Sequence, residues 1–221
     1  MTPDAAPAVR RGAAGCLVVR SAPAVPAAAV LLLHGGRSEG LGPPPLVNLP
    51  ALRMRPFATA VARALAGRDV LVAEVRYRHR GWNGDRRDAA QDAAAALARL
   101  RERAGPIPVV LVGHSMGGRA ALSAAGDPMV RGVVALAPWC PPGEPVEHLA
   151  GRTIHVLHDE ADRVTSAREA WDFVRRARTA GADAVAIPMT TGGHAMLRGA
   201  AHWHRRTAEL TAALLGDPDG S

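Results

Sequence analysis

Short apolar runs separated by helical segments constrain the fold of this chain more than any other feature. Seven runs rich in Val, Leu, Ile and Ala lie at 16–19, 28–33, 70–75, 109–112, 132–137, 153–157 and 184–187. Segments rich in Ala, Leu, Arg and Glu with helical spacing lie at 56–67, 85–104, 117–126, 166–181 and 198–215. Runs this short predict strands, many of them buried on both faces. The alternation predicts an α/β fold with a mostly parallel sheet of about seven or eight strands and helices on both faces.

The chain length fits one domain. A chain of 221 residues can bury a sizeable core by itself, and we expect a single domain over 13–216. Residues 1–12 are rich in Pro and Ala without a period, which predicts a flexible N-terminus. Two loops rich in Pro and Gly, at 37–55 and 138–151, are long enough to shape a ligand site.

Charge and cysteine content restrict the partners. The formal net charge is +7, but the basic residues are all arginines and no run exceeds two, which argues against a nucleic-acid partner. Cys16 and Cys140 flank apolar segments and predict free, buried thiols. The longest apolar run, 24–33, contains a proline and is far shorter than a membrane span. We therefore expect a cytoplasmic protein with no membrane partner; the sequence does not indicate an oligomeric state.

One serine lies where an apolar run must turn sharply. The stretch VVLVGHSMGG, residues 109–118, places Ser115 in a G-x-S-x-G pattern between a predicted strand and a predicted helix. Such a turn holds a nucleophilic serine in strained backbone geometry at the carboxyl end of a strand, where open α/β sheets bind ligands. A serine here could instead only cap the helix, but the flanking glycines favour the nucleophile.

A serine hydroxyl needs a base and a carboxylate to become a nucleophile. His194, in the glycine-rich stretch TTGGH after the last predicted strand, is the candidate base, with a solvated loop histidine as the alternative. Asp162, in the turn after the strand predicted at 153–157, is the candidate carboxylate. Asp159 is the alternative, because turn boundaries read from sequence are uncertain by a few residues.

The negative oxygen of a tetrahedral intermediate needs two backbone donors. The N–H group of Met116, directly after the serine, is the first candidate. The second is the N–H group of Gly36 in HGGR, residues 34–37, with the N–H of Arg37 as the next choice. His34 and His114 are expected to have structural or pocket-wall roles.

Three further side chains are candidate substrate-binding residues: Arg37, Trp82 and Trp139. Each lies just after a predicted strand and so reaches the same edge of the sheet. The two tryptophans could equally pack their own loops.

Together these motifs carry a resemblance. HGG after one strand, GHSMGG after another, then Asp162 and His194, make the chain resemble the α/β-hydrolase superfamily from about residue 14 to 215. The resemblance implies a sheet of about eight strands with an antiparallel one near its start, here shortened because about seven are visible. The short segment 138–152 leaves no room for a large cap. The layout is similar to dienelactone-hydrolase-like proteins and small carboxylesterases, although Ser115 in place of cysteine argues against dienelactone hydrolase activity itself.

The function that these residues predict is a serine hydrolase. Ser115 would attack a small-molecule ester, or alternatively a thioester or amide, and form an acyl-enzyme. His194 would take the proton of the serine hydroxyl, and Asp162 would orient the imidazole of His194. This chemistry needs no metal or other cofactor. An acyltransferase with the same residues and a non-catalytic binding module on the same fold are the alternatives. The acyl chain and the alcohol are not readable from the sequence.

Overall fold

A seven-stranded sheet forms the centre of the protein, for which a computed structural model describes residues 16–216. The prediction for residues 1–12 concerns a part of the chain outside the described residues. The strands are β1 (Leu17–Ser21), β2 (Ala28–Leu33), β3 (Val70–Val75), β4 (Val109–His114), β5 (Val130–Leu136), β6 (Thr153–Asp159) and β7 (Asp183–Met189). Their order is β1-β3-β2-β4-β5-β6-β7, and only the β1–β3 pair is antiparallel. The predicted fold class is confirmed, with the antiparallel strand at the edge.

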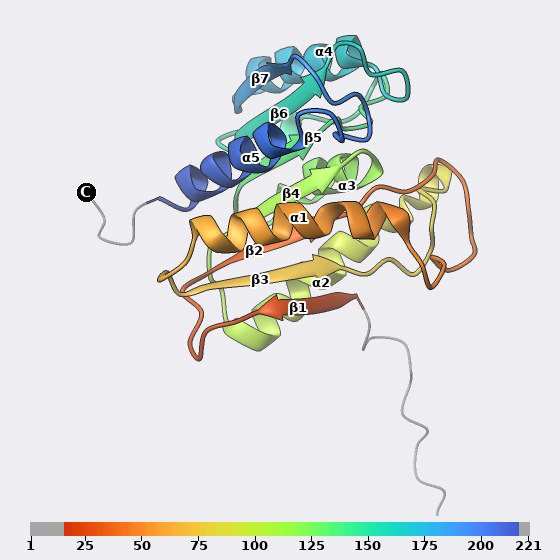
Figure 1. The fold of residues 1–221 in the computed structure, drawn as a ribbon. Helices are drawn as coiled ribbons and strands as arrows, with labels where there is room; N and C mark the ends of the chain where they lie inside the picture. The colour runs from red at the N-terminus through yellow and green to blue at the C-terminus, as the bar shows by residue number, and fades with distance from the viewer. Residues whose placement is uncertain (1–15, 217–221) are drawn as a thin grey trace, which may run out of the picture.

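Helices cover both faces of this sheet (Figure 1). The α-helices are α1 (Leu49–Ala64), α2 (Asp88–Ala104), α3 (Met116–Ala124), α4 (Ala167–Thr179) and α5 (Ala200–Leu215). One apolar cluster joins α1 and α5 to one face of the sheet, and a second joins α2, α3 and α4 to the other. In β2 the side chains of Val30 and Leu32 enter the first cluster, whereas those of Leu31 and Leu33 enter the second. This alternation explains why β2 is apolar along its whole length.

Helix α1 starts earlier than predicted. The sequence suggested a helix from residue 56 and a loop over 37–55, but the helix begins at Leu49 with Pro50 in its first turn. Pro56 lies inside the helix and resembles a start signal, because proline is favoured at the first helical position. Burial of Met54 and Phe57 against the sheet stabilises the helix across that proline.

The edge of the sheet at the carboxyl ends of its parallel strands carries no large cap. The parallel strands β2, β4, β6 and β7 end on the same side of the molecule (Figure 1). Between β5 and β6 the chain forms only one short helical turn, η2 (Glu147–Leu149), so no large cap covers that edge, as predicted. Within residues 16–216, no helix is long and apolar enough to cross a membrane.

Candidate active site

Ser115 occupies a strained turn between β4 and α3. Its backbone angles are φ 55° and ψ −119°, in a region that non-glycine residues rarely adopt. The turn is possible because its neighbours lack side chains. A Cβ atom at Gly113 would overlap the carbonyl of Gly117, and one at Gly117 would overlap the carbonyl of Leu33. The side chain of Ser115 is therefore held at the carboxyl edge of the sheet, and the residue is 8% exposed.

The loop after β2 lies directly against this turn. A Cβ atom built on Gly35 would be 3.4 Å from Cβ of Ser115, and one on Gly36 would be 2.6 Å from Sδ of Met116. Within the described chain, the N–H groups of Gly36 and Met116 donate to no other group. The N–H of Arg37 instead donates to the carbonyl of Arg80 at 3.0 Å. Two unbonded amides therefore lie beside Ser115, and the alternative amide is already engaged.

Asp162 and His194 form a direct pair. Nδ1 of His194 donates to Oδ2 of Asp162 at 2.9 Å. The other carboxylate oxygen accepts the N–H groups of Val164 at 2.7 Å and Thr165 at 3.2 Å. Burial favours a raised pKa for Asp162, but hydrogen bonds from Val164, His194 and Thr165 outweigh it and hold that pKa below its ordinary value. The carboxylate stays charged, so Nδ1 of His194 carries a proton and Nε2 is left as the basic nitrogen.

Two other side chains hold the backbone around His194. Asp159 accepts the N–H of Gly193 at 2.7 Å, and Nε2 of His114 donates to the carbonyl of His194 at 2.9 Å. His114 directly precedes Ser115, and its ring centroid lies 4.9 Å from that of His194. Burial, followed by the nearby His194, lowers the pKa of His114 to about 3, so this imidazole stays neutral. Asp159, the alternative carboxylate, therefore contacts the loop and not the ring.

Oγ of Ser115 and Nε2 of His194 are not hydrogen-bonded to each other in the described chain. Among residues 16–216, neither Oγ of Ser115 nor Nε2 of His194 takes part in a hydrogen bond. The structure thus brings Ser115, His194 and Asp162 to one edge of the sheet through β4, the loop after β7 and the loop after β6.

Two residues at this site were missed in the sequence. The hydroxyl of Thr165 lies 2.9 Å from Oδ2 of Asp162 and 3.1 Å from Nδ1 of His194. His158 is completely buried, with Nε2 at 3.3 Å from the same carboxylate oxygen. The position of Thr165, three residues after Asp162 and before the helix cap Ser166, was a usable signal. Nothing local distinguishes His158 from other strand residues.

The three predicted substrate-binding residues lie near this edge in different settings. Arg37 is exposed, Trp139 is half-buried, and Trp82 is only 1% exposed. The guanidinium of Arg119 lies 3.9 Å from the ring centre of Trp82 and 4.4 Å from that of Trp139. Arg119 also pairs with Glu144. The N–H of Trp139 donates to the carbonyl of Ser115 at 3.2 Å, so this tryptophan is the nearer of the two.

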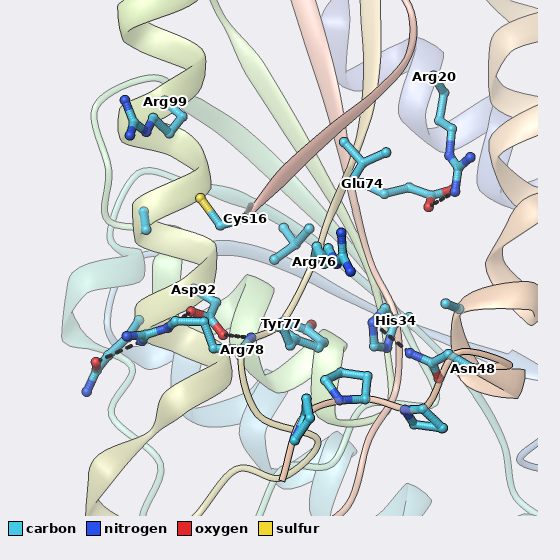
Figure 2. A pocket seen from close by; sticks show the side chains of 18 of the residues that line it. Cys16, Arg20, His34, Asn48, Glu74, Arg76, Tyr77, Arg78, Asp92 and Arg99 are labelled. Atoms are coloured by element: carbon cyan, nitrogen blue, oxygen red, sulfur yellow. Dashed lines mark hydrogen bonds and ion pairs between the residues drawn. The ribbon is translucent and has the colours of Figure 1, made fainter. Parts of the chain in front are cut away.

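A long groove borders this site without containing Ser115. It has a volume of about 1220 Å³ and follows the β1–β3 edge of the sheet (Figure 2). His34 lines it near Asn48, and Figure 2 also shows the Arg20–Glu74 and Arg78–Asp92 pairs on its walls. Neither Ser115 nor His194 lines this groove. A second hollow of about 560 Å³ lies over the loop that carries Asp162 and Thr165.

The geometry defines an α/β protein with a serine, a histidine and an aspartate at one sheet edge. Comparison with sequence families agrees, because the alpha/beta hydrolase family matches residues 30–219. The chain belongs to that family. No curated protein matches the sequence significantly.

Solved structures share the fold at low sequence identity. The native esterase Est2 of the Planctomycetes species Thermogutta terrifontis is 18% identical, with a TM-score of 0.66 over 93% of this chain and 90% of that one. An alpha-beta serine hydrolase homologue from Coxiella burnetii is 14% identical, with a TM-score of 0.64 over 89% and 91%. XC6422 from Xanthomonas campestris, a serine hydrolase without lid, is 19% identical, with a TM-score of 0.54 over 90% and 85%.

Proposed function

We propose that this protein is a serine hydrolase that cleaves a small-molecule carboxylic ester through an acyl-enzyme. The observation that carries the proposal is the 2.9 Å bond between His194 and Asp162, together with the bond from His114, the residue before Ser115, to the carbonyl of His194. The strained backbone of Ser115 adds support, because such conformations cluster at active sites. Hydrolases and esterases among the structures of similar fold point to the same reaction class.

In the first half-reaction, Oγ of Ser115 attacks the ester carbonyl while its proton passes to Nε2 of His194. Asp162 fixes the ring with its proton on Nδ1 and stabilises the imidazolium. The tetrahedral intermediate collapses, the carbon–oxygen bond to the alcohol breaks, and the alcohol leaves with the proton from His194. In the second half, a water molecule gives its proton to His194 and attacks the acyl-enzyme, releasing the acid and restoring Ser115.

The N–H groups of Gly36 and Met116 are proposed to hold the negative oxygen of the intermediate. Their lack of other partners in the described chain and the contact between the two residues support this role. Arg37, Trp82 and Trp139 are proposed to contact the substrate. Of the two tryptophans, the half-buried Trp139 has the better access, because Trp82 is almost fully covered.

A fluorophosphonate probe tests the nucleophile. The wild type is expected to become labelled at Ser115 and to hydrolyse short p-nitrophenyl esters, whereas Ser115→Ala should do neither. Ser123→Ala is a matched control, because Ser123 lies on α3 beyond the turn, where it accepts a bond from Arg87. A folded wild type that is neither labelled nor active on a series of esters would support a binding module instead. Products formed with added alcohol separate hydrolysis from acyl transfer.

A further inference from the structure

One oxygen of Asp162 is surrounded by three donors. Besides Nδ1 of His194, Oδ2 is approached by the hydroxyl of Thr165 at 2.9 Å and by Nε2 of His158 at 3.3 Å. The Asp162 and His158 side chains are 0% exposed, and Thr165 is 7% exposed. Protein donors therefore take the place that water has around an exposed carboxylate.

The proton on His158 can be placed from its neighbours. Nε2 faces the carbonyl of Thr165 and the carboxylate of Asp162, both at 3.3 Å, which accept and cannot donate. The hydroxyl of Thr165 also lies 3.3 Å from Nε2, but its proton has a shorter path of 2.9 Å to the charged Asp162. Nε2 therefore carries the proton. Nδ1 has no partner within the described chain, which suits a lone pair better than a buried N–H. Burial lowers the pKa of His158, so the ring stays neutral, and its N–H lies between the carbonyl of Thr165 and Oδ2 of Asp162, each at 3.3 Å.

The hydroxyl of Thr165 has one proton and several neighbours that could use it. The carboxylate of Asp162 at 2.9 Å and the carbonyl of Ala137 at 3.2 Å are acceptors, whereas Nδ1 of His194 at 3.1 Å is a donor. The shorter distance and the charge favour donation to Asp162. The hydroxyl oxygen can then accept part of the Nδ1–H bond of His194. Thr165 thus contacts both members of the pair.

We propose that Thr165 and His158 are positioning residues, which hold Oδ2 of Asp162 in line with His194 and share the charge of that oxygen. The inference rests on the proposed function and adds to it. Each extra donor spreads the negative charge that would otherwise attract the imidazolium of His194 more strongly. The pair thereby keeps its geometry.

The other polar groups around the pair come from three elements. His114 on β4 stays neutral and holds the carbonyl of His194, and Asp159 at the end of β6 is bonded to the N–H of Gly193. Arg53 on α1 acts electrostatically on His114. Variants of Thr165 and His158 leave these groups in place, so a change in pH dependence reports on Asp162 and His194.

Thr165→Val removes the hydroxyl and nearly keeps the shape. We expect kcat for a p-nitrophenyl ester to fall about tenfold, because a hydrogen bond to a charged group is lost. The acid limb of the pH–rate profile should move to higher pH by about half a pH unit, because fewer donors share the charge of Asp162. Thr165→Ser, which keeps the hydroxyl, should restore both. If Thr165 acted only through the packing of its methyl group, Thr165→Ser would be the more impaired variant and Thr165→Val would resemble the wild type.

Variants of His158 test the second proposed positioning residue independently of Thr165. His158→Leu should move the acid limb in the same direction as Thr165→Val, and His158→Gln, whose amide can still donate, should move it less. Thr211→Val and His155→Leu are matched controls. Thr211 is a buried threonine that donates to the carbonyl of Thr207, and His155 is on the same strand as His158 without contact to Asp162.

The deciding measurement is an NMR titration of the His194 ring, which does not depend on turnover. Its pH midpoint should rise in Thr165→Val and match the wild type in Thr165→Ser and in both controls. An unchanged or lower midpoint in Thr165→Val, or a serine variant that behaves like valine, would overturn the proposal. If the wild type cleaves no ester, the proposed function fails, but the titration still decides the role of Thr165.

Discussion

Asp159 accepts a hydrogen bond of 2.7 Å from the N–H of Gly193, the residue before His194. Two carboxylates three residues apart therefore hold two different parts of one loop. Asp159 ends β6 and contacts the loop backbone, whereas Asp162 lies in the following turn and contacts the ring of His194. Because the two carboxylates contact different groups, substituting each one is expected to have a different effect on activity.

Asp162→Asn is expected to lower kcat by about 10³-fold to 10⁴-fold, because an amide favours the wrong tautomer of His194 and cannot stabilise its charged form. Asp159→Asn keeps an oxygen that can accept the N–H of Gly193, so its loss should be about tenfold or less. Steady-state kinetics on one ester measures both. Equal losses in the two variants would contradict the assignment of Asp162 to the ring.

Gly36→Ala should impair the step that forms the negative oxygen. The new Cβ would lie 2.7 Å from the carbonyl of Arg80 and 2.6 Å from Sδ of Met116, so the loop must move. Displacing one donor is expected to lower kcat about 10²-fold. Gly42→Ala in the same loop is the control, because a Cβ there meets nothing within 4 Å. The idea fails if both variants retain wild-type kcat.

Stability should fall on acidification because of His114. Its folded pKa of about 3 lies below the ordinary value of 6.5, so between these values the unfolded chain binds a proton that the folded chain does not. This single group should lower the unfolding free energy by about 2 kcal/mol from pH 7 to pH 5. His114→Gln, which keeps a donor for the carbonyl of His194, should reduce that slope. Urea titrations at both pH values measure it, and an unchanged slope would argue against His114.

Arg119 should stabilise the loops beside the site. Its guanidinium contacts the rings of both Trp82 and Trp139 and pairs with Glu144, and the side chains of Arg119 and Glu144 are 13% and 12% exposed. Arg119→Met should cost about 2 kcal/mol of unfolding free energy. Arg175→Met is the comparison, because Arg175 pairs at the surface and its side chain is 72% exposed. Similar losses in the two variants would mean that the ring contacts contribute little.

Local patterns were sufficient for much of the fold. The strands β2 and β3 have the predicted bounds, because six apolar residues in a row in β2, and five of six in β3, leave little choice beside a turn. Helix α4 lies close to its predicted limits. Its start is fixed by Ser166, whose side chain accepts the N–H of Glu169. The start of α1 was wrong because Pro56 resembles a helix start, and only the burial of Met54 and Phe57 decides otherwise.

The sequence by itself determined the turn at Ser115, since glycines at fixed spacing are required for that backbone, and it determined the order of the elements around it. Only the tertiary structure decided which carboxylate contacts His194 and that Thr165 and His158 share it. These contacts join residues on different loops and strands, and their distances depend on how the sheet is packed, which no local pattern records.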